Sequence, residues 1–66
     1  MLIVLNGKSH ECPARMTVAE LLEATGFAQR RVAVEVNRRI VPRSRHAMQN
    51  LEPDDRVEIV HAIGGG

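Results

Sequence analysis

The residues of this 66-residue chain that are best suited to chemistry stand at its end, Ile63-Gly64-Gly65-Gly66. A terminal carboxyl has a reference pKa of about 3.3–3.7, so it is an anion at neutral pH and a poor electrophile until it is activated. Gly66 has no side chain to crowd attack at its carbonyl, and Gly64 and Gly65 reach conformations closed to other residues. Extended, the three glycines reach about 10 Å. A frayed chain end is the plainer alternative, but the pattern favours a carboxylate that a partner activates.

Other candidate groups are isolated along the sequence. Cys12 is the only cysteine, which excludes an internal disulfide, and a strand cysteine is more often a small buried apolar residue. His10, His46 and His61 lack the spacing of a metal site. No glycine-rich loop opens a helix, as ATP phosphates require. We therefore expect no catalytic residues, no metal and no cofactor bound by the chain itself, and an enzyme is the weakest interpretation.

Composition narrows the class of protein. The net charge is +1 and 44% of the residues are hydrophobic, values that suit one small folded domain. Phe27 is the only Phe, and Trp and Tyr are missing, so stacking on nucleic acid is not expected. No apolar run is long enough for a bilayer and no signal peptide begins the chain, so a cytoplasmic protein without membrane contact is expected.

Arginines crowd the middle of the chain: Arg30, Arg31, Arg38, Arg39, Arg43 and Arg45. Some could dock an acidic partner surface, although a solvated face is the simpler interpretation of each one alone. Acidic residues follow them, and one face of the domain could be basic while another is acidic.

The elements that must position the chain end begin with a hairpin. Leu2 to Leu5 is apolar and branched, which predicts a strand, and Asn6-Gly7 supplies the two positive φ angles of a type I′ turn. A second strand is then expected over 8–12, ended by Pro13 because proline has no N–H to donate.

A helix is predicted over 18–25. Thr17 and Glu20 stand at the N-cap and N3 positions of a capping box, in which each side chain bonds the backbone of the other residue. Gly26 stands where a left-handed residue would end the helix.

The rest of the chain reads as strands and turns. We expect a strand from Val32 to Asn37, an edge element at Ile40-Val41, a turn or single helical turn within 44–51, a turn at 53–55 and a last strand over 56–62. A helix on one face of a mixed sheet, with the first and last strands paired in its middle, is an α+β fold of the β-grasp type. Residues 1–63 would form this domain and 64–66 a flexible tail.

Strand alternation predicts a patch on the face of the sheet away from the helix. If Ile3 faces the helix, Leu2 and Val4 face the other way, and the same reasoning places Val60 and Ala62 there. We expect these four residues to form an exposed apolar partner-binding patch beside the root of the tail.

The chain resembles the ubiquitin-like sulfur carrier proteins over essentially its whole length, and most closely those of thiazole formation in thiamine biosynthesis. The resemblance rests on Ile3-Val4-Leu5-Asn6-Gly7, Thr17-Val18-Ala19-Glu20-Leu21-Leu22, Val34-Glu35-Val36-Asn37, Ile40-Val41-Pro42-Arg43 and the terminal glycines. The glycine end is shared by many ubiquitin-like proteins, whereas the block from Asn37 to Arg43 is more particular to the thiamine branch.

The resemblance implies a reaction sequence. An E1-like adenylyltransferase uses ATP to adenylate the Gly66 carboxylate, a sulfurtransferase or cysteine desulfurase supplies sulfur to make a thiocarboxylate, and thiazole synthase takes that sulfur. The carrier would be a monomer when free. Alternatives are a carrier of the molybdopterin pathway, a modifier conjugated to proteins through Gly66, and an interaction module whose tail is inert.

Overall fold

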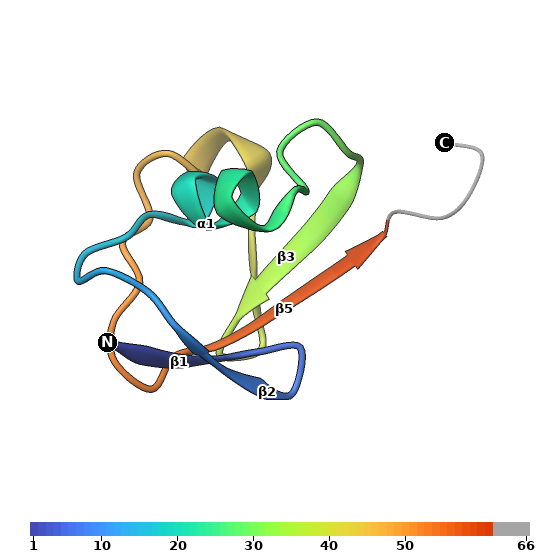
Figure 1. Ribbon diagram of the computed structural model, residues 1–66. Helices are drawn as coiled ribbons and strands as arrows, with labels where there is room; N and C mark the ends of the chain where they lie inside the picture. Colours follow the sequence, from blue (N-terminus) through green and yellow to red (C-terminus); the bar gives the residue numbers. More distant parts are fainter. Residues whose placement is uncertain (62–66) are drawn as a thin grey trace.

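The computed structural model describes residues 1–61, which form five strands, one α-helix and one 3-10 turn (Figure 1). Their bounds are β1 Leu2–Leu5, β2 Lys8–Glu11, α1 Val18–Thr25, β3 Val32–Val36, β4 Arg39–Val41, η1 Arg43–Arg45 and β5 Arg56–His61. The predictions for Ala62, for the tail 64–66 and for a domain boundary at residue 63 lie outside the described residues.

The predicted first hairpin is confirmed. Asn6 and Gly7 have φ angles of 49° and 84°, and β1 pairs antiparallel with β2 so that Leu5 lies opposite Lys8. β2 ends at Glu11, one residue earlier than expected. Cys12 nevertheless continues the pairing, because its N–H donates to the carbonyl of Met1 at 2.9 Å.

The helix has the predicted bounds and the predicted caps. The Thr17 hydroxyl accepts from the Glu20 N–H at 3.1 Å, and the Glu20 carboxylate accepts from the Thr17 N–H at 2.9 Å, which completes the capping box. Gly26 ends the helix with a φ of 86°, in the left-handed region that favours glycine. The helix start therefore depends on two side chains and its end on one backbone conformation.

The sheet order is β2-β1-β5-β3-β4, which places β5 in the centre. β5 runs parallel to β1, with Leu5 opposite Val57, and antiparallel to β3. The predicted pairing of the first and last strands is therefore confirmed. β4 lies at the edge, where the brief apolar pair before Pro42 predicted an edge element.

Helix α1 covers one face of the sheet and the core lies between them (Figure 1). The most deeply buried side chains are Ile3, Val18, Leu21, Val34, Leu51 and Val57. Each buried aliphatic side chain of this size contributes about 1.5–3 kcal/mol to folding. Ile3, Val57 and Ile59 point toward the helix, as strand alternation predicted.

The segment 43–51 closes the same layer. The helical turn expected within 44–51 lies at the beginning of this segment, as η1. Beyond it, the backbone runs beside the start of α1, because the Val18 N–H donates to the Gln49 carbonyl and the Leu51 N–H to the Met16 carbonyl, at 2.9 and 2.7 Å. These bonds hold Leu51 in the core.

Candidate functional site

The candidate site is the end of β5, because the chain leaves the described domain there toward its terminal glycines. His61 is the last described residue and lies opposite Val32, the first residue of β3. Figure 1 shows β5 running from the middle of the molecule to one end of the sheet. β5 is paired with β3 from Val57 to His61, whereas β1 pairs with it only at Arg56 and Val57.

Asn6 extends the support of β5 beyond the last residue of β1. The Asn6 N–H donates to the Val57 carbonyl at 2.9 Å, as a further rung of the parallel ladder would. Its side-chain oxygen then accepts from the Ile59 N–H at 2.8 Å. A side chain therefore replaces the backbone acceptor that β1 no longer supplies, and sequence analysis had assigned Asn6 only to the turn.

On the helix side, the end of β5 meets the segment that follows α1. The rings of Phe27 and His61 meet edge to face, with centroids 5.8 Å apart and planes inclined at 62°. The Phe27 N–H donates to the Leu22 carbonyl at 2.8 Å, which ties this ring to the end of the helix. Phe27 packs against the core and also contacts the last described residue of β5.

The beginning of β5 is held by polar side chains instead. Asn37 donates to one Asp55 oxygen at 3.0 Å and accepts from the Arg56 N–H at 2.9 Å. The other Asp55 oxygen accepts from the Glu52 N–H at 2.9 Å. Both oxygens of Asp55 are thus engaged in holding turns together, which argues against a role in acid–base chemistry.

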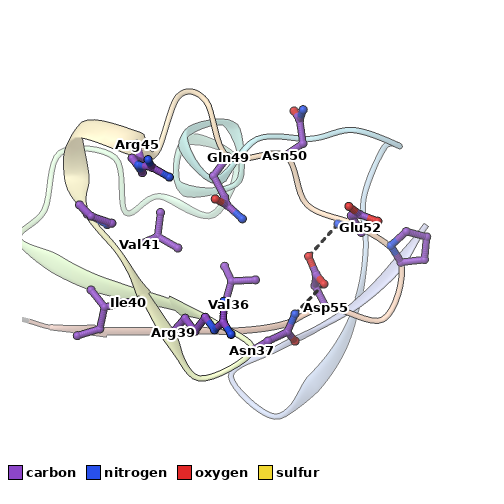
Figure 2. Close-up of a pocket in the computed structure, with 12 residues that line it drawn as sticks. Val36, Asn37, Arg39, Ile40, Val41, Arg45, Gln49, Asn50, Glu52 and Asp55 are labelled. Carbon is purple, nitrogen blue, oxygen red and sulfur yellow. Dashed lines mark hydrogen bonds between the residues drawn. The ribbon is translucent and has the colours of Figure 1, made fainter.

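These residues border a hollow of about 670 Å³ beside β4. Figure 2 shows Asn37 and Asp55 bonded at one end and Gln49 extending toward the interior from the opposite segment. Val36 and Val41, which are buried, also line it. The hollow lies beside the beginning of β5, where Asn37 and Asp55 meet.

The predicted apolar patch is divided by the register of the sheet. Leu2 and Val60 are equally exposed, at 53%, and both face away from the helix. However, Val4 lies opposite Arg56, so Val60 stands four residues further along β5, about 13 Å at 3.3 Å per residue. Glu58 lies between them on the same face.

Val60 instead lies opposite Ala33, at the end of the sheet from which the tail continues. Leu2 and the half-buried Val4 belong to the other end of the molecule. Val60 is therefore the described member of the predicted patch that stands near the tail, and Ala62 lies outside the described residues.

Cys12 is buried. Within residues 1–61, no group of three or more His, Cys, Asp or Glu side chains could hold a metal ion. None of the helices in this part of the chain has the length and apolar character to cross a membrane.

A mixed five-stranded sheet, with its first and last strands parallel and one helix across one face, defines a ubiquitin-like β-grasp domain. A crystal structure of the thiamine biosynthesis protein ThiS from Geobacter metallireducens has the same fold, with a TM-score of 0.89, 32% identity and full coverage of both chains.

The sequence identifies the family. The sequence model of the ThiS family matches residues 3–66. The sulfur carrier protein ThiS of Escherichia coli K12 is 35% identical over 66 residues, the whole of both chains. Thiazole synthases from Magnetococcus marinus and Paramagnetospirillum magneticum are each 46% identical over all 66 residues, and the chain spans only about a fifth of their length, 20% in each case. The chain belongs to the ThiS family of sulfur carrier proteins.

Proposed function

We propose that this chain carries sulfur as a thiocarboxylate on Gly66 for thiazole formation in thiamine biosynthesis. An adenylyltransferase joins the carboxylate to AMP from ATP and releases pyrophosphate. A sulfur donor then displaces AMP. Thiazole synthase passes the sulfur to its substrate, and an oxygen atom from that substrate or from water takes the place of the sulfur and restores the carboxylate. The chain itself acts as a substrate that shuttles between enzymes and is not a catalyst.

The observation that carries this proposal is the central place of β5, the strand after which the terminal glycines follow in the sequence. The final residues follow directly from the central strand of a sheet whose fold and family are those of sulfur carriers. Five residues, 62 to 66, separate His61 from the terminal carboxyl, and such a segment spans at most about 16–18 Å. The carboxyl can thus enter a partner's active site while the domain stays outside.

Two observations favour thiazole formation over the molybdopterin pathway. Two relatives that are 46% identical to this chain are named thiazole synthases, and a similar segment forms part of each of those longer proteins. A carrier and the enzyme that consumes its sulfur can share one chain because the sulfur passes directly between them.

The proposal is tested by intact mass spectrometry. The purified chain is incubated with ATP, a sulfur source and an extract of cells that lack their own carrier. We expect a gain in mass equal to the replacement of one oxygen by sulfur. Adducts of much greater mass would indicate a modifier of proteins, and an unchanged mass in an extract that charges a known carrier would indicate an interaction module.

Two variants separate the role of Gly66 from that of the fold. Deletion of Gly66 should abolish the mass gain. Addition of one tryptophan after Gly66 should do the same, because the Gly66 carboxyl then forms a peptide bond and the new terminal carboxyl belongs to a bulky residue. Both variants should unfold at the same urea concentration as the unaltered chain. Full charging of an extended variant that remains uncleaved would contradict the proposal.

A further inference from the structure

A second cavity, of about 240 Å³, lies on the helix side of the sheet. Arg30, Arg31 and Arg43 line it together with His46, and the other residues of its lining are aliphatic. Among the described residues that form this lining, none is acidic. The cavity therefore gathers three positive charges without a carboxylate in its own wall.

The arginines reach the cavity from two separate segments. Arg30 and Arg31 belong to the connection between α1 and β3, whereas Arg43 begins η1. The guanidinium group stays protonated at any physiological pH and offers a planar fork that fits a carboxylate. The three side chains are exposed and line one cavity, so together they offer an oxyanion several hydrogen-bond donors.

The floor of the cavity is rigid because His46 is fixed from several sides. His46 is 9% exposed, and its Nε2 lies 3.0 Å from the Val41 carbonyl oxygen. Its backbone carbonyl accepts from the Ala19 N–H at 2.9 Å, and its N–H donates to the Arg43 carbonyl at 3.1 Å. These bonds tie η1 to both α1 and β4, and they hold the backbone of Arg43 in place before any ligand binds.

The size of the cavity limits what it can receive. Pockets for small molecules usually measure about 300–1,000 Å³, and this one is smaller. A single carboxylate or phosphate group suits it better than a whole nucleotide.

The cavity lies at the end of the sheet from which the tail continues. Val32, part of its lining, is paired with His61, the last described residue of β5. Figure 1 shows the connection between α1 and β3 over this same end. The five following residues span at most about 16–18 Å. The active-site entrance of a partner that reacts with Gly66 must therefore lie close to this end of the domain.

We propose that Arg30, Arg31 and Arg43 receive an aspartate or glutamate side chain at the entrance of the adenylyltransferase, with His46 holding η1 in position. The proposal rests on the proposed function. A protein carboxylate is preferred to a phosphate of ATP, because ATP reacts at Gly66 while the cavity stands beside the root of the tail. Recognition at this point would let the enzyme select its carrier before the reaction begins.

The test uses the cognate adenylyltransferase and follows pyrophosphate release at increasing concentrations of the carrier. We expect Arg43→Gln to raise the KM for the carrier about tenfold and to leave kcat unchanged, since only docking is weakened. Arg31→Gln with Arg43→Gln should raise the KM further. Arg43→Lys should recover part of the loss, because it keeps the charge and loses the fork.

Arg15→Gln is the matched control. It removes the same charge from an exposed residue near Met1, away from the end of β5, and should leave the KM unchanged. The KM of the unaltered carrier should also rise steeply with salt, and the double variant should show a weaker dependence. Urea unfolding of each variant checks that η1 remains folded.

The outcomes separate the two proposals. If the unaltered chain is never adenylated, the proposed function fails. If it is adenylated and the double variant has the same KM, only the docking proposal fails. Inorganic phosphate is the last probe: sub-millimolar binding seen by NMR at Arg43, combined with an unchanged KM, would assign the cavity to a free anion and overturn the docking proposal.

Discussion

The two ends of β5 are held in different ways. At its beginning, Asn37 and Asp55 form a closed set of hydrogen bonds with backbone groups of Arg56 and Glu52. At its end, the contacts are the edge-to-face meeting of Phe27 with His61 and the pairing with β3. The polar groups at the beginning of β5 therefore form their hydrogen bonds within the domain.

The end of β5 leaves more side chains exposed to other molecules. Val60 is 53% exposed there, and the three arginines of the small cavity stand on the other side of the sheet. The difference teaches that polar contacts hold this strand at its beginning, while the groups at its end stay exposed, as the proposed docking requires. Changes at the beginning should act on stability, and changes at the end should act on docking.

Val60 and Leu2 give the largest expected contrast. They are equally exposed and share a face, but they lie at opposite ends of the sheet. Val60→Asp should raise the KM of adenylation by tenfold or more, about 1.4 kcal/mol or above, because a charge would be buried beneath the partner. Leu2→Asp should leave the KM near its original value.

Pyrophosphate release measures both KM values, and urea unfolding measures both stabilities. Each variant should lose little stability because both side chains are half exposed to solvent already. An equal rise in KM for the two variants would mean that the partner covers the whole open face. It would contradict the claim that docking depends on the end of β5 alone.

Asn37 tests the beginning of the strand. Asn37→Ala removes the bonds to Asp55 and Arg56 and also places alanine at a φ of 53°. The expected loss is about 2–3 kcal/mol in the free energy of unfolding, measured with urea.

Asn37→Gly separates the two causes, since glycine accepts this backbone conformation without strain. It should lose about 1–2 kcal/mol, from the hydrogen bonds alone. Adenylation at saturating carrier should be unchanged in both variants. A selective fall in kcat, with the fold intact, would show that the beginning of β5 also serves the reaction.

Phe27 gives the smallest expected effect. Phe27→Leu keeps an apolar side chain but loses the edge-to-face contact, so we expect a loss of about 0.5–1.5 kcal/mol on urea unfolding. His61→Phe keeps a ring pair and should stay near the stability of the unaltered chain. A larger loss for His61→Phe than for Phe27→Leu would mean that His61 contributes through something other than its ring.

Local signals in the sequence predicted most of the fold. The capping box at Thr17 and Glu20, the turn at Asn6-Gly7 and the alternation of Val32, Val34 and Val36 each act within a few residues, so their outcome does not depend on distant parts of the chain. The hairpin between β3 and β4 was less visible, because Asn37 and Arg38 both take positive φ angles without a glycine.

The candidate site could be predicted only in part. Alternation tells which residues of one strand share a face, but it does not tell how far two strands are offset along each other. The offset that sets Leu5 opposite Val57 separates Val60 from Leu2, and no local pattern encodes it. The hydrogen bond from the Ile59 N–H to the Asn6 side chain joins residues 53 positions apart, and no local pattern predicts it either.

The central position of β5 has a mechanical consequence. In the proposed function, a force on the chain end would act along the axis of β5, and ladder hydrogen bonds lie across the strands. Such a pull shears the bonds to β1 and β3 together, whereas an edge strand such as β4 could be peeled away one bond at a time. The domain should therefore stay folded when its chain end is withdrawn from one active site and enters the next.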